Sequence, residues 1–440
     1  MIEIRKPDAT LMKLLPPVKP QTDIKYKPSQ FALTFEHNGR QYVFNTLTKQ
    51  CVEGALPGNA MAGEGFDELI VNQFLVPENK DECAYYNQIS ALMRAYSRKK
   101  DIRGYTILPT FACNARCVYC YEEGMKQVTM TPGIVERTIG YILETRLKDK
   151  SVKLAWFGGE PLMCTGIIDR ICEGLRENGV EYKSSMISNG SFITPEIVEK
   201  MVSDWKLDHI QISADGAEQD YIKRKNYRDC NDHYISVMRS CGLISEKGIK
   251  VTVRCNVDEE NFGNIGKFLD DMKANVGHKE NVSVYFAPLN NVRMGENDLE
   301  MWRRINAAGS LIEAAGFVVS PFLGIGTGFR INHCMADGNS VVIAPDGSLY
   351  LCEHCPPQSR FGNIFDGITD KAAHDSFCNV GKTREKCRKC PFLPDCTSFA
   401  NCPVYDTHCR EVHELNAYEA LARMVDNKEN ENTDGENPIC

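Results

Sequence analysis

The sequence has no long hydrophobic run and no large excess of charge of one sign. No apolar stretch approaches the roughly 20 residues of a membrane-spanning helix, so no transmembrane segment is expected. The first residues, MIEIRKPDAT, carry charges where a signal peptide would carry its apolar core. The net charge of -8 gives no electrostatic reason to expect nucleic acid or an anionic membrane as a partner. We therefore expect a cytoplasmic protein.

Length and cysteine content favour a multi-domain protein that binds metal. The 440 residues exceed one ordinary domain, and 42% hydrophobic and 25% charged residues are typical of a globular protein. There are 20 cysteines, of which three lie at 113–120 and eight lie between Cys334 and Cys409 when Cys378 is left out. Clustered cysteines in the reducing cytosol bind metal more often than they form disulfides. The scattered cysteines are expected to be small buried hydrophobic side chains.

The N-terminal part is predicted to form a small module of strands and helices. Residues 1–27 hold several prolines and are expected to be an extended lead-in. The stretch FALTFEHNGRQYVFNT predicts a β-hairpin, because alternating apolar residues flank an Asn-Gly turn. Helices are expected near 66–73 and 81–98. Residues 28–98 would thus be winged-helix-like, and they either capture a peptide or only pack against the main domain.

From residue 104 onward, strand-like apolar runs alternate with amphipathic helices. Six strands are expected, at 105–110, 153–157, 182–188, 209–214, 251–257 and 282–288. Helices are expected near 132–147, 165–178, 195–205, 234–247, 261–275 and 298–315. Thr131 and Thr194 each precede a proline, which is the pattern of an N-cap followed by proline at N1. This alternation favours parallel strands with right-handed crossovers, and six units are too few for a closed eight-stranded barrel.

The predicted fold class is α/β: a partial, open (β/α)6 barrel at 104–316, the N-terminal module, and a Cys-rich C-terminal domain. Residues 333–412 are rich in Cys, Pro and Gly, so they are expected to depend on bound metal clusters for stability. A closing helix is predicted at 413–426. The polar residues 427–440 are expected to be a disordered tail.

Three cysteines, Cys113, Cys117 and Cys120, directly follow the first predicted barrel strand. The carboxyl ends of barrel strands are where active sites form. Three thiolates without a fourth nearby suggest a metal centre with one open position, and thiolates are the ligands of iron–sulfur clusters. A tetrahedral zinc site is the alternative.

Glycines or polar residues stand at the same end of the next four strands. They are Gly158, Gly159 and Glu160, then Ser188 and Asn189, then Ser213 and Asp215, then Arg254 and Asn256. Paired glycines let a backbone approach a ligand closely, and Glu160 adds an acceptor for a cationic group. Together these residues predict one ligand site at the mouth of the barrel.

The cysteine triplet and the Gly-Gly-Glu strand end closely resemble the motifs of the radical S-adenosylmethionine (SAM) superfamily, over residues 104–290. The resemblance implies that Cys113, Cys117 and Cys120 bind a 4Fe-4S cluster whose open iron takes the methionine moiety of SAM. Further implied contacts are Gly158, Gly159 and Glu160 for the ammonium, Tyr119 near the adenine, Ser188, Asn189, Ser213 and Asp215 for the ribose or methionyl part, and Arg254 for the carboxylate. The implied chemistry is reductive cleavage to a 5′-deoxyadenosyl radical, fed by an external flavodoxin- or ferredoxin-like electron donor.

The C-terminal cysteines resemble the SPASM extension of that superfamily, which implies two auxiliary 4Fe-4S clusters. The distal ligands would be Cys387, Cys390, Cys396 and Cys409, and the proximal ligands Cys334, Cys352 and Cys402. Five residues separate Cys396 from Cys402 where the family usually has three, so the roles of Cys402 and Cys409 are open. The fourth proximal ligand would be Cys355, His354 or a substrate thiolate. A zinc ribbon is the alternative from the cysteine spacing alone.

The resemblance implies an enzyme that crosslinks a ribosomally synthesised precursor peptide through a thioether, ether or carbon–carbon bond. The leader peptide would add as a strand to the edge of the predicted hairpin. Glu353 would act as a base, or is an ordinary solvated or ion-paired glutamate. The alternatives are maturation of a protein, such as formylglycine formation, and epimerisation with a thiol donor among Cys164, Cys230, Cys241 and Cys255. A non-catalytic cluster scaffold would not need a SAM pocket.

Overall fold

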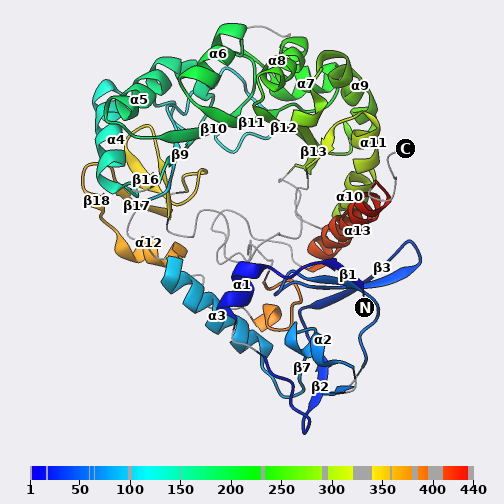
Figure 1. Ribbon diagram of the computed structural model, residues 1–440. Coiled ribbons are helices and arrows are strands. Elements are labelled where there is room, and N and C mark those ends of the chain that lie inside the picture. The colour runs from blue at the N-terminus through cyan, green and yellow to red at the C-terminus, as the bar shows by residue number, and fades with distance from the viewer. Residues whose placement is uncertain are drawn as a thin grey trace, which may run out of the picture. The chain divides into compact units, whose positions relative to one another are not determined.

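The computed structural model describes most of the chain, and Figure 1 shows its helices and strands. The described residues are 2–15, 18–58, 60–63, 65–97, 102–148, 150–228, 233–289, 296–320, 339–356, 359–378, 385–394 and 410–434. They fall into two compact units. The N-terminal unit comprises residues 1–98, 323–337 and 380–440, and the barrel unit comprises residues 99–322 and 338–379.

The barrel unit is built on one large open sheet. Among the described residues its strand order is β14-β13-β12-β11-β10-β9-β8-β15-β16-β17-β18. The parallel strands are β8 (Gly104–Ile107), β9 (Val152–Trp156), β10 (Tyr182–Ser188), β11 (Leu207–Ser213), β12 (Lys250–Val257), β13 (Val282–Pro288), β14 (Val318–Val319) and β15 (Ser340–Ile343). The antiparallel extension is β16 (Ser348–Tyr350), β17 (Arg360–Asn363) and β18 (Gly367–Ile368). The predicted strands are β8 to β13, which confirms an α/β fold with a parallel sheet.

Helices connect the parallel strands and lie along the outer side of the sheet (Figure 1). They are α4 (Pro132–Thr145), α5 (Thr165–Glu177), α6 (Pro195–Ser203), α7 (Glu218–Lys225), α8 (Tyr234–Glu246), α9 (Ile265–Asn275), α10 (Glu296–Ala307) and α11 (Gly309–Ala314), followed later by α12 (Lys371–Cys378). Short 3-10 turns are η1 (Pro161–Cys164), η2 (Phe262–Asn264) and η3 (Lys279–Asn281). The hydroxyls of Thr131 and Thr194 accept the backbone N–H of Ile134 and Ile197, so both predicted N-caps are confirmed.

Side chains on one face of the strands form the core of the barrel unit. Trp156, Ile210 and Val253 are fully buried, as residues pointing from the sheet to the helix layer should be. Helix α7 has no counterpart in the prediction. Its sequence EQDYIKRK is dominated by charged residues, so it carries no apolar repeat from which a helix could be recognised.

The N-terminal unit contains two small antiparallel sheets. One has the order β1-β5-β4-β3, from β1 (Ile2–Arg5), β3 (Ala32–His37), β4 (Arg40–Asn45) and β5 (Cys51–Glu53). The other has the order β6-β2-β7, from β2 (Lys25–Pro28), β6 (Ala60–Met61) and β7 (Leu75–Pro77). The helical segments are α1 (Ala9–Leu14), α2 (Asp67–Val71), α3 (Glu82–Ser97), η5 (Glu385–Cys387) and α13 (Arg410–Asp434). The predicted hairpin is β3–β4, and its turn residues Asn38 and Gly39 both have positive φ.

The two ends of the chain are more regular than the sequence analysis predicts. Residues 1–27 include β1 and α1, because Met12 and Leu15 pack against buried Phe31 and Leu47. Helix α13 continues to Asp434, well into the segment predicted to be a disordered tail.

Contacts made by α13 across the unit account for its length. Ala417, Leu421 and Val425 pack against the hairpin core. At the polar edge of the helix, Asp426 and Glu429 pair with His37 at 2.7 Å and Arg40 at 3.2 Å. These partners lie almost 400 residues away in sequence, so the polar composition after residue 426 gave no sign that the predicted closing helix continues.

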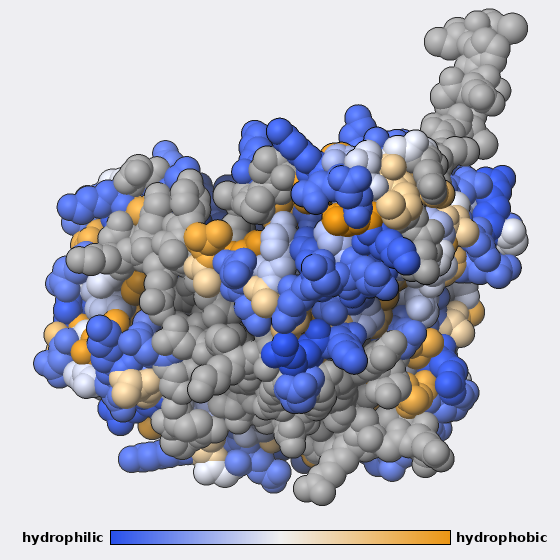
Figure 2. Space-filling model, turned by 90° about the horizontal axis from the view of Figure 1, so that it is seen from below, coloured by the Kyte–Doolittle hydropathy of each residue, from blue (hydrophilic) through white to orange (hydrophobic). Residues whose placement is uncertain are grey.

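The face of the molecule in Figure 2 is mainly hydrophilic where the residues are described. On the face in Figure 2, hydrophobic residues form only small separate groups, as single exposed apolar side chains do on ordinary proteins. No described helix is long and apolar enough to cross a lipid bilayer.

Candidate functional site

The three cysteines lie in the loop that follows β8. Cys113, Cys117 and Cys120 are each partly exposed, and none of them forms a disulfide. The backbone N–H of Cys120 donates to the carbonyl oxygen of Cys117 at 3.0 Å, which makes a tight turn. Burial raises the pKa of all three thiols, that of Cys113 to about 12. In the free protein these thiols therefore stay protonated, and a bound metal would have to displace their protons.

Backbone hydrogen bonds hold this cysteine loop against the C-terminal end of α7 and the residues just after it. The N–H groups of Arg116 and Val118 donate to the carbonyl oxygens of Lys225 at 3.0 Å and Arg224 at 3.1 Å. In return, the N–H of Arg228 donates to the carbonyl oxygen of Asn114 at 2.9 Å. The loop is thus positioned by the protein backbone itself.

Gly158 and Gly159 are needed for contact between the end of β9 and the cysteine loop. A Cβ atom on Gly158 would lie 2.3 Å from the carbonyl oxygen of Thr110, and one on Gly159 would lie 2.3 Å from that of Ala112. The φ of Gly158 is also positive, at 111°. The sequence analysis assigned both glycines to a bound ligand, whereas the structure also uses them to pack two loops together.

Glu160 is a fully buried carboxylate that is oriented by three donors. Its Oε1 accepts the backbone N–H of Leu162 at 3.0 Å and the Ser188 hydroxyl at 2.8 Å, and its Oε2 accepts the N–H of Asn189 at 2.8 Å. Burial raises the pKa of Glu160 to about 7, against the lowering effect of these hydrogen bonds. Because a carboxylate offers about four lone pairs, Oε2 retains capacity for one more donor.

Asn189 links Glu160 to the cysteine loop. Its side-chain amide donates to the Asn114 Oδ1 at 2.9 Å and lies 3.8 Å from the Sγ of Cys113. The predicted site residues Glu160, Ser188 and Asn189 therefore meet beside the first cysteine.

A second cluster lies around Lys225, which the sequence analysis did not select. Lys225 is 1% exposed. Its Nζ lies 3.1 Å from the Asp215 Oδ2 and 3.0 Å from both the Tyr119 and Ser213 oxygens. Tyr119 in turn donates to Asp215. The neighbouring charges raise the pKa of Lys225 well above its usual value, Asp215 most of all, although burial opposes the rise. Three predicted site residues are thus joined by one buried ammonium.

Both carboxylate oxygens of Asp215 are engaged inside the protein. The Asn256 side chain donates to Oδ1 at 2.9 Å, while Tyr119 and Lys225 use Oδ2. Arg254 lies one step further, with its Nε donating to the Asn256 Oδ1 at 2.9 Å. A chain of polar contacts therefore runs from the cysteine loop to β12.

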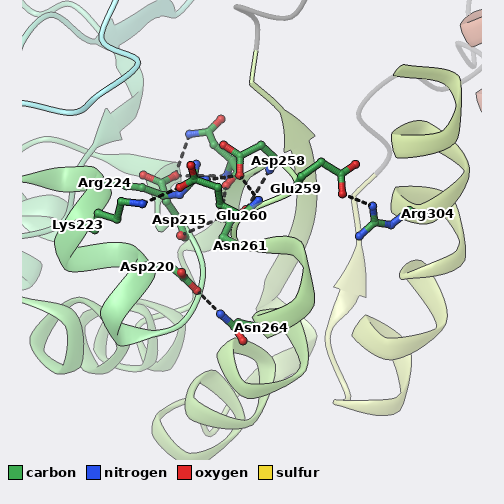
Figure 3. A network of polar contacts seen from close by, with 11 residues as sticks. Asp215, Asp220, Lys223, Arg224, Asp258, Glu259, Glu260, Asn261, Asn264 and Arg304 are labelled. Carbon is green, nitrogen blue, oxygen red and sulfur yellow. Dashed lines mark hydrogen bonds and ion pairs between the residues drawn. The ribbon is translucent and has the colours of Figure 1, made fainter. Parts of the chain in front are cut away.

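Figure 3 shows how this network continues to the loop before α9. Asn261 donates to the backbone oxygens of Asp215 at 3.1 Å and Asn256 at 2.9 Å, and Asp258 accepts from buried Arg224 (Figure 3). Outer pairs join Lys223 to Glu260 at 2.7 Å, Glu259 to Arg304 at 2.7 Å and Asp220 to Asn264 at 2.9 Å. In the sequence the run Lys223-Arg224-Lys225 looks like a solvated helix face, but only Lys223 is exposed.

Two further cysteines of the barrel unit lie close to the cysteine loop. Cys352 and Cys355 are each 8% exposed, and the N–H of Cys355 donates to the carbonyl oxygen of Cys352 at 2.9 Å. His354, between them, packs on the ring of Tyr121 with centroids 3.9 Å apart. The half-buried Glu353 belongs to the same turn. The sequence analysis did not predict that these two loops meet.

The remaining predicted ligands and donors are distributed as follows. Cys387 and Cys390 belong to the N-terminal unit. Cys230, Cys334, Cys396, Cys402 and Cys409 lie outside the described residues. Of the thiols considered for hydrogen donation, Cys241 and Cys255 are fully buried among core residues, whereas Cys164 is half-buried.

No three His, Cys, Asp or Glu side chains in the described part of the chain converge on one point suited to a single metal ion. A tetrahedral zinc site would need such convergence. A polynuclear cluster takes one thiolate at each of several irons, so its ligands need not converge. Cys113, Cys117 and Cys120 are three partly exposed thiols on one short loop, an arrangement that suits such a cluster.

Comparisons with known proteins agree with this geometry. Residues 107–272 match the Radical SAM superfamily. The radical SAM cyclopropyl synthase TigE of Paramaledivibacter caminithermalis is 21% identical over 379 residues, which cover 77% of this chain and 76% of TigE.

Two solved structures have a similar fold. Native anSMEcpe with bound AdoMet superposes with a TM-score of 0.59 at 16% identity, covering 74% of this chain and 99% of that one. Streptococcus suis SuiB bound to precursor peptide SuiA gives a TM-score of 0.50 at 15% identity, covering 84% of this chain and 94% of that one. At such identities these matches show the fold alone.

Proposed function

Because the chain carries the domain of the radical SAM enzyme superfamily, we propose that it uses SAM to modify a ribosomally synthesised precursor peptide. The observation that carries this proposal is the meeting of the cysteine triplet with the buried carboxylate of Glu160 at the mouth of the parallel sheet. An anionic acceptor beside an open iron suits the ammonium of a methionine moiety. The modification would be a thioether, ether or carbon–carbon crosslink.

The cysteine loop fits a 4Fe-4S cluster. Cys113, Cys117 and Cys120 come from one loop, and hydrogen bonds to the C-terminal end of α7 hold the backbone of that loop. Such a cluster would supply the electron that cleaves SAM. Three protein thiolates would leave the fourth iron free to bind the methionine moiety of SAM.

The chain's own residues would bind and orient SAM around that cluster. Glu160 would receive the ammonium, because its Oε2 accepts the N–H of Asn189 and retains a lone pair. Asn189 would orient that carboxylate and lie near the methionyl part. Tyr119 would lie against the adenine and Ser188 and Ser213 near the ribose or methionyl part. Arg254 would pair with the carboxylate.

The contacts of Asp215 and Lys225 suggest positioning roles. Since both oxygens of Asp215 are used by protein donors, it would hold Tyr119 and Asn256 in place instead of touching SAM. Lys225 would neutralise Asp215 in the buried site and fix the Tyr119 hydroxyl.

The proposed substrate is a peptide with a leader segment. Related folds include SuiB bound to its precursor peptide and anSMEcpe bound to the Kp18Cys peptide, the latter at a TM-score of 0.58. In the N-terminal unit β3 is at the end of its sheet order, so its outer backbone groups can pair with an added strand. We assign leader capture to this edge and retain the description of the module as winged-helix-like.

Auxiliary clusters complete the proposal. Cys352 and Cys355 lie beside the cysteine loop and would hold the proximal cluster together with ligands outside the described residues. Glu353, in the same turn, would accept the substrate proton. Of the three described thiols considered as hydrogen donors for an epimerase, Cys164 is partly exposed, whereas Cys241 and Cys255 are buried.

An anaerobic experiment tests the central assignment. The reconstituted protein is expected to hold about twelve irons per chain and to form 5′-deoxyadenosine with SAM and dithionite. The Cys113→Ala/Cys117→Ala/Cys120→Ala variant should lose about four irons and all cleavage. Deoxyadenosine formation by that variant would refute the site.

A further inference from the structure

The Cys387–Cys390 turn is built into the core of the N-terminal unit. Phe392, two residues after Cys390, is 2% exposed and packs with Phe35 and Phe44 of the β3–β4 hairpin. Cys390 itself is half-buried against the same core. Leu393 packs on a neighbouring core that contains Phe31, Leu47, Tyr86 and Ile89. The turn therefore shares its hydrophobic contacts with residues some 350 positions earlier in the chain.

Polar contacts fasten the backbone of the turn to the same part of the unit. The Thr46 hydroxyl donates to the carbonyl oxygen of Pro391 at 2.6 Å. On the other side of Cys390, the Gln30 amide donates to the carbonyl oxygen of Arg388 at 3.1 Å. Both donors flank the β3–β4 hairpin in sequence, so hairpin and turn are held together from two sides.

The turn itself has the shape of a two-thiolate metal ligand. The N–H of Cys390 donates to the carbonyl oxygen of Cys387 at 3.1 Å, and the N–H of Leu393 donates to that of Cys390 at 3.2 Å. This places both cysteines on one short turn at the Cys-x2-Cys spacing common in metal sites. The described segment around it, 385–394, contains only the 3-10 turn η5 and makes no strand of its own.

We propose that metal bound at Cys387 and Cys390 is a structural staple of the N-terminal unit, and that the β3–β4 hairpin depends on it for rigidity. A segment with so little secondary structure must offset its ordering entropy through bound metal, the apolar contacts of Phe392 and Leu393 and the two hydrogen bonds above. The contacts of Phe392 fall on the hairpin, whose β3 is last in the strand order of its sheet. The link to peptide capture rests on the proposed function, but the staple itself does not.

Hydrogen exchange on the full chain tests the staple. Cys387→Ser/Cys390→Ser is compared with wild type and with Cys164→Ser, a half-exposed cysteine of the barrel unit. The double variant should lose metal. Its backbone amides at residues 32–45 should exchange about tenfold faster or more, and exchange in β10 to β12 should not change. Treating wild type with an iron chelator should reproduce the effect. Metal loss from the double variant without faster exchange in the hairpin would refute the proposal that metal at this turn stabilises the hairpin. Full metal retention by the double variant would refute it as well.

A second variant keeps every cysteine and tests the coupling from the other side. Thr46→Val removes the hydrogen bond to Pro391, and metal at the turn should be lost to the chelator several-fold faster. The matched control is Thr34→Val, which alters an exposed threonine of β3. Equal loss rates for both variants would refute the coupling. Deoxyadenosine formation is measured in parallel: its absence in wild type would refute the proposed function and leave the staple result intact.

Discussion

Two of the described cysteine turns, one in each unit, are held in different ways. The loop of Cys113 to Cys120 is fixed by backbone hydrogen bonds to the C-terminal end of α7 and by close packing against Gly158 and Gly159. The Cys387–Cys390 turn is fixed mainly by two apolar side chains and two side-chain hydrogen bonds. The backbone of the barrel unit thus positions the first turn, as catalysis requires of a site, whereas the proposed role of metal at the second turn is to supply the order that its backbone does not.

The largest predicted effect is the loss of deoxyadenosine formation on substitution of Gly159, which packs against the cysteine loop. In Gly159→Ala the new Cβ would overlap the Ala112 carbonyl oxygen at 2.3 Å, so the cysteine loop must move. Because a displacement of about 1 Å can cost about 100-fold in rate, deoxyadenosine formation should fall at least that much. The control is Gly166→Ala, where a Cβ meets nothing within 4 Å. Near-normal activity of Gly159→Ala would mean that the loop is not preorganised by this contact.

Removing the buried ammonium of Lys225 should have the next largest effect, a fall in the free energy of unfolding. Lys225→Met leaves Asp215 as an uncompensated buried charge, which typically costs about 3–5 kcal/mol of stability. Lys225→Met/Asp215→Asn should recover part of that loss. Lys223→Met, at an exposed ion pair, should change stability by less than about 1 kcal/mol. Denaturant unfolding of the cofactor-free chain measures all three, and equal effects of the two lysine substitutions would contradict the positioning role.

SAM binding should depend on pH through Glu160. The folded-state pKa of about 7 lies above the usual 4.5, so the carboxyl is protonated in the free enzyme below about pH 7. By linkage, this group contributes stability that is present below pH 4.5 and lost as the pH rises through 7. Binding of an ammonium needs the charged form, so SAM affinity should fall about tenfold per pH unit below 7.

Equilibrium dialysis of the reconstituted enzyme between pH 5.5 and 8 checks this dependence. Glu160→Gln should bind SAM more weakly and show no such pH dependence, because its amide does not titrate. A pH profile in Glu160→Gln identical to that of wild type would assign the titration to another group.

The smallest effect is expected at the ring contact between the cysteine loop and the turn of Cys352 and Cys355. Tyr121→Ala removes the packing on His354, and such ring pairs contribute about 0.5–1.5 kcal/mol. Iron bound by the barrel unit should be lost a few-fold faster to a chelator. Tyr121→Phe keeps the ring and should behave like wild type. A larger effect of Tyr121→Phe than of Tyr121→Ala would point to the hydroxyl instead.

Much of the barrel unit could be predicted because its signals are local. The strands β8 to β13 are short runs in which apolar residues recur, as in VKLAW and VSVYFAP, and Thr131 and Thr194 mark helix starts within a single turn. The cysteine triplet and Gly158-Gly159-Glu160 could be placed together, since the carboxyl ends of neighbouring parallel strands share one edge. Lys225 could not be found in this way, because a lysine within a charged helix is ordinarily solvated.

Residue order alone thus specifies the parallel sheet, the cysteine spacing and the polar strand ends, since these depend on periodicity over a few residues. Only the tertiary structure reveals that Lys225 is buried against Asp215 and that α13 and the Cys387–Cys390 turn complete the N-terminal hairpin. The physical reason is that burial and charge compensation are properties of partners in space. The Thr46–Pro391 hydrogen bond joins residues 345 positions apart, and no local pattern in one segment contains the other.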